Sequence, residues 1–223
     1  MSRVIHDFAK EMQLFSSPRN NVKEFQKLFD GCHKVLDIGC GKSSPLIYIT
    51  PPFCVGIEKY KPDLEAAKQT QTHDEFYELD ALSCKEHFGE NKFDVCVAFD
   101  VIEHFTKKDG LKLLADMEKM AAKRVIIFTP NGFLPQQGFE AGDFQEHLSG
   151  WDVNEMRNLG YNVIGLNGLK SLRTEHYRLK YKPQALWAII SWLTQFYCRN
   201  RPHQATAILC WKDIKNKCIK SAS

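Results

Sequence analysis

The chain has 223 residues, of which 43% are hydrophobic, so it is long enough to bury one complete core and fits a single α/β domain. Its 30 basic and 27 acidic residues give a formal net charge of +3 without long runs of one sign, which argues against a duplex nucleic-acid partner but leaves single-stranded RNA open. The eight cysteines form no CxxC pair and the opening segment is too polar for a secretory signal, so free thiols and a cytoplasmic location are expected.

The first 30 residues are predicted to form one or two short helices, because apolar side chains recur there at helical spacing. These side chains are Phe8, Met12, Phe15, Val22, Phe25, Leu28 and Phe29. A helical cap over residues 1–30 would pack on a sheet as a structural layer. At the other end, residues 213–223 are predicted to be a polar tail.

Residues 34–44, with the sequence KVLDIGCGKSS, form the motif around which the other elements are arranged. Its apolar first half predicts a buried strand, and the chain then turns at Gly39 and Gly41 toward a predicted helix. Glycine lets the backbone take a positive φ, so that a ligand can lie against the main chain. Asp37 precedes the turn, and Glu58 follows the next apolar run, 19 positions after Gly39. In nucleotide-binding α/β sheets an acid about 20 residues on binds the ribose hydroxyls.

Strand and helix patterns alternate along the remaining sequence. Strands are predicted at residues 53–57, 75–79, 93–99, 124–129, 161–166 and 205–211, and helices at 62–71, after Thr106, at 152–159 and at 184–198. This alternation predicts an α/β fold, a doubly wound and mostly parallel sheet with helices on both faces. The stretch 133–150 is too long for a simple connection and is predicted to be an active-site loop.

The pattern Asp37-x-Gly39-x-Gly41 lacks the third glycine of a dinucleotide fingerprint and instead resembles the first motif of class I S-adenosylmethionine (SAM) methyltransferases. The resemblance implies a Rossmann-like seven-stranded sheet of order 3-2-1-4-5-7-6 and a methyltransferase domain over residues 31–212. It also implies that SAM is the cofactor, with Asp37 near its methionine end, Glu58 on the ribose and Asp80 on the adenine amino group. The implied cofactor-binding set is Asp37, Gly39, Cys40, Gly41, Glu58, Asp80, Ala81 and Asp100. The resemblance also implies that an N-terminal segment such as residues 1–30 can close over cofactor and substrate.

Two carboxylates and an imidazole follow the predicted strand at 93–99. Asp100, Glu103 and His104 stand at positions i, i+3 and i+4, which share one face of a helical turn. With His147 further on, this pattern resembles the metal-assisted O-methyltransferases of ubiquinone biosynthesis and the small-RNA 2′-O-methyltransferases, although those families usually have glutamate where this chain has Asp100. Three alternatives follow: a divalent cation (Mg²⁺ or Mn²⁺) on all four residues, a metal-free pocket with His147 or His104 as catalytic base, or structural histidines.

Together these patterns predict a SAM-dependent methyltransferase that methylates a hydroxyl oxygen of a small-molecule or lipid-like acceptor. The alternatives are an RNA 2′-O-methyltransferase and a non-catalytic, methyltransferase-like binding protein. The apolar helix at 184–198 is too short to cross a bilayer, which takes about 20 residues. It is interpreted either as a core or lid helix, or as a helix that contacts a membrane surface or lines a pocket for a lipid-like acceptor.

Overall fold

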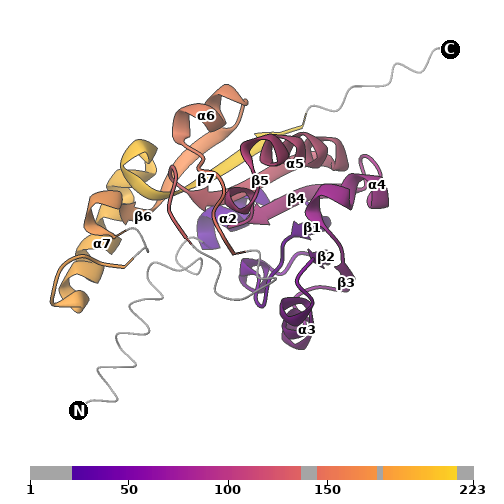
Figure 1. Cartoon of the computed structure of the whole chain (residues 1–223), viewed down its shortest axis with the longest axis horizontal. Coiled ribbons are helices and arrows are strands. Elements are labelled where there is room, and N and C mark those ends of the chain that lie inside the picture. Colours follow the sequence, from indigo (N-terminus) through magenta and orange to yellow (C-terminus); the bar gives the residue numbers. More distant parts are fainter. Residues whose placement is uncertain (1–21, 137–144, 175–177, 215–223) are drawn as a thin grey trace.

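The computed structural model describes residues 22–136, 145–174 and 178–214, and it contains one seven-stranded sheet (Figure 1). The strand order is β3-β2-β1-β4-β5-β7-β6, which confirms the order expected from the sequence. Strands β1 to β5 run parallel, while β7 pairs antiparallel with both β5 and β6. The strands are β1 (Lys34–Ile38), β2 (Phe53–Glu58), β3 (Glu75–Glu78), β4 (Phe93–Phe99), β5 (Ala121–Pro130), β6 (Asn162–Leu169) and β7 (Ala205–Asp213).

Helices connect the strands and cover the sheet (Figure 1). The α-helices are α2 (Val22–Leu28), α3 (Lys61–Thr70), α4 (Cys84–Phe88), α5 (Lys107–Met120), α6 (Val153–Asn158) and α7 (Gln184–Arg199). Short 3₁₀ turns are η2 (Pro45–Tyr48), η3 (Ala81–Ser83), η4 (Ile102–His104), η5 (Lys170–Leu172) and η6 (Pro202–Gln204).

The helix expected after the glycine turn is only the single 3₁₀ turn η2. Ser44 caps this turn, as its hydroxyl oxygen accepts a hydrogen bond from the backbone N–H of Leu46 at 3.2 Å. Two residues separate the end of this turn from Pro51 and Pro52, and proline lacks the N–H that a continuing helix needs. The prediction of a helix after Gly41 was therefore wrong, since only this one 3₁₀ turn forms.

Two apolar cores lie on the two faces of the sheet. Successive residues of a strand point to opposite faces, and accordingly Leu36 belongs to one core and Val35 to the other. Helix α5 covers the first face with Leu113 and Met117, both fully buried. Helix α2 covers the second face, where Phe25 packs edge-on against the rings of Phe99 and Phe128 at centroid distances of 5.2 and 6.0 Å.

The predicted cap at residues 1–30 is described only from residue 22 on, where it forms α2. The remainder of that cap, residues 137–144 of the predicted active-site loop and residues 215–223 of the predicted tail lie outside the described residues. Seven cysteines fall in the described part, and all seven are free and buried, as expected of small apolar side chains in a core.

Candidate functional site

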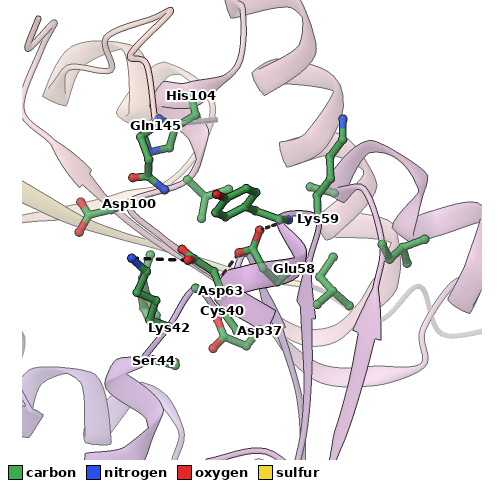
Figure 2. Close-up of a pocket in the computed structure, with 18 of the residues that line it drawn as sticks. Asp37, Cys40, Lys42, Ser44, Glu58, Lys59, Asp63, Asp100, His104 and Gln145 are labelled. Carbon is green, nitrogen blue, oxygen red and sulfur yellow. Dashed lines mark hydrogen bonds and ion pairs between the residues drawn. The ribbon is translucent and has the colours of Figure 1, made fainter. Parts of the chain in front are cut away.

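A pocket of about 660 Å³ lies over the carboxyl ends of β1, β2 and β4 (Figure 2). Strand order reverses between β1 and β4, and ligands of open α/β sheets bind at such a point. All eight residues that the sequence suggested for cofactor binding line this pocket: Asp37, Gly39, Cys40, Gly41, Glu58, Asp80, Ala81 and Asp100. Its size suits a ligand of nucleoside dimensions.

The glycine turn forms the floor of the pocket, and its two glycines have different roles. Gly39 has φ +68°, and a Cβ there would lie 2.7 Å from Cγ2 of Val101. Both the backbone conformation and the space therefore require glycine at this position. Gly41 has φ +54°, but a Cβ there would have no atom within 4 Å, and its N–H points to the carboxylate of Glu58.

Glu58 is fixed by the backbone on both of its oxygens. One oxygen accepts from Gly41 N at 3.1 Å and the other accepts from Tyr60 N at 2.8 Å. Burial raises the pKa of Glu58, and these two N–H groups counteract part of that rise. Because a carboxylate oxygen can accept two hydrogen bonds, each oxygen keeps a lone pair for a ligand hydroxyl.

Asp80 caps the 3₁₀ turn η3 at the end of the pocket formed by β3. Its side chain accepts from Leu82 N at 2.9 Å and from Lys59 Nζ at 2.7 Å. Partial burial would raise the pKa of Asp80, but the hydrogen bonds from Lys59 and Leu82 N and the positive charges of Lys59 and Lys112 together outweigh it, and the pKa falls below its ordinary value. Across the pocket Lys42 approaches Asp63 at 3.6 Å, so two lysines lie among the rim acids (Figure 2).

Asp37 lines the pocket, although its side chain is almost completely buried. It is 1% exposed, and its Oδ2 lies 2.9 Å from Nε2 of His73, which is equally buried. Sequence reasoning did not find His73, because it lies 36 positions from Asp37 and only the pairing of β2 with its neighbours brings it close. The other ring nitrogen of His73 has no partner among the described residues.

The η4 turn positions a buried carboxyl behind the pocket. Glu103 is 2% exposed, and its Oε2 accepts a hydrogen bond from the Thr129 hydroxyl at 3.0 Å, while its Oε1 has no partner in the described part of the chain. Burial and the nearby charge of Asp100 raise the pKa of Glu103. Burial likewise raises the pKa of Asp100.

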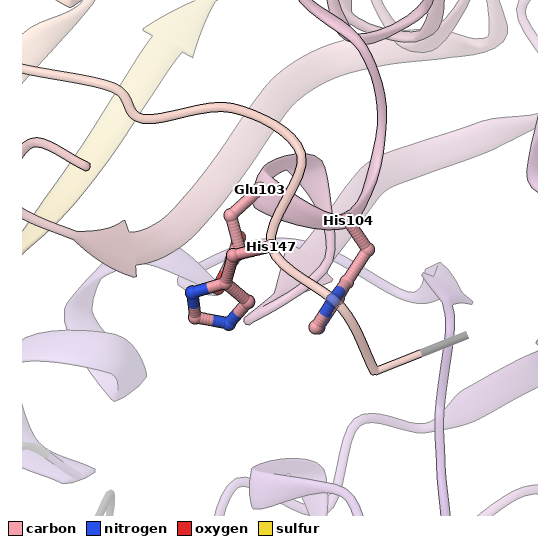
Figure 3. A group of neighbouring side chains, drawn as sticks. All are labelled: Glu103, His104 and His147. Atoms are coloured by element: carbon pink, nitrogen blue, oxygen red, sulfur yellow. The ribbon is translucent and has the colours of Figure 1, made fainter. Parts of the chain in front are cut away.

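Glu103, His104 and His147 come together and each can offer one ligand atom, with these atoms within 4.8 Å of one another (Figure 3). Asp100 is not part of this group, although its spacing predicted that it would be. Its backbone takes the left-handed conformation, φ +53°, and helical turn η4 begins only at Ile102, so the expected i, i+3, i+4 face does not form. Asp100 lines the larger pocket instead.

The two histidines are held by the same kind of bond. His147 Nδ1 lies 2.7 Å from the carbonyl oxygen of Leu134, and His104 Nδ1 lies 3.0 Å from that of Glu146. A carbonyl can only accept, so Nδ1 carries the proton in each neutral ring and Nε2 carries the lone pair. Burial lowers the pKa of His147, which favours its neutral form.

Residues 147–151 reach this position through backbone pairing. The N–H groups of Leu148 and Ser149 donate to the carbonyl of Glu103 at 2.8 and 3.0 Å. The fully buried Trp151 then donates from Nε1 to the carbonyl of Ile102 at 3.2 Å. Two segments about 45 positions apart are thus joined, and His147 is placed beside Glu103. Gln145, which sequence reasoning did not find, lines the pocket from the same segment.

Residues 36–129 match the model of a family described as "Methyltransferase domain". A SAM-dependent methyltransferase from Archaeoglobus fulgidus has a similar structure, with TM-score 0.58, 13% identity, and coverage of 92% of this chain and 98% of that one. The methyltransferase domain of bacterial CtHen1 gives TM-score 0.55 and 15% identity over 90% and 100% of the chains. Magnesium protoporphyrin IX methyltransferase from Synechocystis, solved with bound SAM, has a TM-score of 0.52 and 13% identity, with coverage of 92% of this chain and 80% of that one. No curated protein matches the chain in sequence.

Proposed function

We propose that the chain is a class I SAM-dependent methyltransferase that transfers the methyl group of SAM to a hydroxyl oxygen of a small-molecule or lipid-like acceptor, and the match of residues 36–129 to a methyltransferase-domain family supports this. The observation that carries this proposal is the juxtaposition of the glycine-floored pocket with Glu103, His104 and His147. SAM, when bound, supplies a methyl group activated by its sulfonium. The residues of the chain have to bind and orient the reactants and remove a proton from the acceptor.

The pocket residues fit SAM by their chemistry. The second lone pairs on the Glu58 oxygens suit the two ribose hydroxyls, since both oxygens are already fixed by backbone N–H groups. Asp80 and Ala81 would face the adenine end, and Asp37 and Asp100 the methionine end. Carboxylates on the rim counterbalance the sulfonium and ammonium charges of such a ligand.

The acceptor hydroxyl requires a group that takes or stabilises its proton, and His147 suits this role. Its buried, neutral ring carries the lone pair on Nε2, so it can act as a general base near neutral pH. His104 lies beside it, at a centroid distance of 4.9 Å, as a second candidate base.

The same residues also fit a divalent cation. Glu103 Oε1 is a buried oxygen without a partner among the described residues, and both histidines donate Nδ1–H to backbone carbonyls, as metal-bound histidines generally do. We therefore propose Glu103, His104 and His147 as ligands of Mn²⁺ or Mg²⁺, without Asp100. A cation there would supply Lewis acidity that lowers the pKa of a hydroxyl.

An acceptor with apolar character is favoured by the surroundings of His147. Leu148 follows His147 in the chain and is 52% exposed, and Phe133, which precedes Leu134, is 58% exposed. Leu134, next to Phe133, supplies the carbonyl that holds the His147 ring. These exposed side chains, close to His147 and Leu134 along the chain, would bind the apolar part of an acceptor that extends over them.

Methyl-labelled SAM incubated with the protein and a fractionated lysate tests the proposal. Label in the lipid or small-molecule fraction, in a product with an O-methyl group, is the expected result, and it should fall at least about hundredfold in His147→Ala. His33→Ala is the matched control and should retain activity, because His33 is exposed and directly precedes the amino end of β1, whereas the pocket lies at the carboxyl ends of the strands. Label in RNA would support the alternative RNA 2′-O-methyltransferase. If the protein binds SAM but no fraction carries label, the result would support the non-catalytic binding protein.

Chelation separates the two ways of activating the hydroxyl. If a cation bound to Glu103, His104 and His147 is required, EDTA abolishes activity, Mn²⁺ or Mg²⁺ restores it, and Glu103→Gln abolishes the restoration. Full activity after thorough chelation would instead leave His147 as a metal-free base.

A further inference from the structure

Helix α7 lies along β6 at the edge of the sheet (Figure 1). An edge helix of a soluble domain normally turns its apolar stripe inward and its polar side chains outward. Helix α7 does the opposite, and of its sixteen residues only Ser191 and Cys198 are buried.

The side of α7 that faces β6 is polar and closely fitted. Thr194 Oγ1 accepts from Leu169 N, and Gln195 Oε1 accepts from Gly168 N, both at 3.1 Å. Gln195 Nε2 also donates to the Gly165 carbonyl at 3.1 Å.

Glycine makes this close approach to β6 possible. A Cβ on Gly168 would lie 2.3 Å from the carbonyl oxygen of Ser191, and one on Gly165 would lie 2.3 Å from that of Cys198. The orientation of α7 is therefore fixed by specific backbone contacts.

The outward side of α7 consists of large apolar side chains, each between 41% and 69% exposed. They are Leu186, Ile189, Trp192, Leu193, Phe196 and Tyr197, and we call this surface the α7 face. Six such side chains on one short helix form a larger apolar surface than scattered surface residues do, and a patch of this kind marks an interaction site.

The charges on the segment that carries the α7 face are all of one sign. Between Glu175 and Asp213 the sequence contains no Asp or Glu. Exposed Lys180 and Lys182 precede the helix and exposed Arg201 follows it, with the Arg201 guanidinium over the ring of Tyr197 at 4.3 Å. The apolar face is thus bounded at both ends by cations.

We propose that the α7 face docks on an anionic lipid surface, with the helix in the plane of the interface. Apolar and aromatic side chains would enter the boundary between headgroups and acyl chains while the basic residues contact the phosphates. A helix of 16 residues is about 24 Å long, and no helix among the described residues is long and apolar enough to cross a membrane, so an interfacial position suits it.

The charges favour this occupant over a second copy of the chain. A symmetric dimer through the α7 face would bring each copy's basic flanks against those of its partner, with no acidic residue on this segment to pair with them. An anionic lipid surface satisfies the apolar side chains and the cations together. The proposal is independent of the acceptor, because docking concerns binding and not methyl transfer.

Vesicle co-sedimentation of the full chain tests the proposal. Binding to vesicles that contain phosphatidylglycerol should exceed binding to pure phosphatidylcholine vesicles at least about tenfold, and high salt should weaken it. The double variant Leu193→Glu/Phe196→Glu should lose at least about tenfold, and Lys180→Glu/Lys182→Glu should lose several-fold.

The control is Leu111→Glu, which makes one such Leu→Glu substitution at an apolar residue of α5 that is 42% exposed. It should bind vesicles like the unmodified chain. Unchanged SAM affinity in all variants shows that the fold is intact, so a loss of vesicle binding reports on the surface itself.

Three results would overturn the proposal. The first is no binding to anionic vesicles, and the second is equal binding by the Leu193→Glu/Phe196→Glu variant and the unmodified chain. The third is a dimer in sedimentation velocity that this double variant converts to monomer, because the α7 face would then belong to a second copy.

Discussion

Replacing Glu58 by glutamine tests the proposed ribose contact most directly. The substitution keeps the size of the side chain and removes its charge. One oxygen becomes an NH₂ group, which faces the N–H of either Gly41 or Tyr60 and cannot accept from it. The variant therefore loses one fixed oxygen that would accept from a ribose hydroxyl.

The magnitude follows from the strength of a hydrogen bond to a charged group, about 1.5 to 3 kcal/mol. We expect Glu58→Gln to bind SAM about 10- to 150-fold more weakly, since about 1.4 kcal/mol corresponds to tenfold in Kd. Isothermal titration calorimetry with SAM and with S-adenosylhomocysteine measures this loss. Both ligands have the same ribose, so both affinities should fall by the same factor.

The chain provides a matched control on the next strand. Glu78 pairs in register with Glu58 across β2 and β3, is exposed and is absent from the pocket lining. Glu78→Gln removes the same charge at the same edge of the sheet and should change SAM affinity less than threefold, roughly the range of an exposed charge. An equal loss in both variants, or a loss confined to SAM, would refute the ribose contact and indicate a general effect of charge on the sulfonium.

Two further predictions concern stability. Gly39→Ala should lower the free energy of unfolding by about 2 to 5 kcal/mol, from the left-handed backbone and the contact with Val101, whereas Gly41→Ala should lose only about 1 to 2 kcal/mol for its backbone. Denaturant titration measures both, and equal losses would contradict the packing argument. Asp94→Asn should lose about 1 kcal/mol at neutral pH. Partial burial would raise the pKa of Asp94, but two backbone N–H groups and Lys123 at 2.9 Å lower it overall. Because the pKa of Asp94 is lower in the folded than in the unfolded chain, where it is about 3.9, ionised Asp94 stabilises the fold above that pH, and this stabilisation disappears as the pH falls. The free energy of unfolding of Asp94→Asn should therefore decrease less than that of the unmodified chain between about pH 5 and pH 1. If urea titrations show that the free energy of unfolding falls equally with pH in the variant and in the unmodified chain, the prediction is wrong.

Much of the fold was predictable because it depends on local patterns. The buried strands read as apolar runs, Asp152 and Thr106 cap their helices as their positions indicated, and the Asp37 to Glu58 spacing placed the pocket at the correct strand ends. The sequence predicted a helix where only the 3₁₀ turn at Pro45 forms, and it did not predict the short helix α4, since brief turns leave too few residues to show a period.

The candidate site divides along the same line. The sequence by itself determined the pocket residues on β1, β2 and β4, because parallel strands bring their carboxyl ends to one edge wherever each strand lies in the chain. Only the tertiary structure decided that His73 contacts Asp37 and that α7 turns its apolar side outward. It also decided that Asp100 lies outside the group formed by Glu103, His104 and His147. Each of these depends on contacts between segments far apart in sequence or on one residue in a left-handed conformation, and no local periodicity records either.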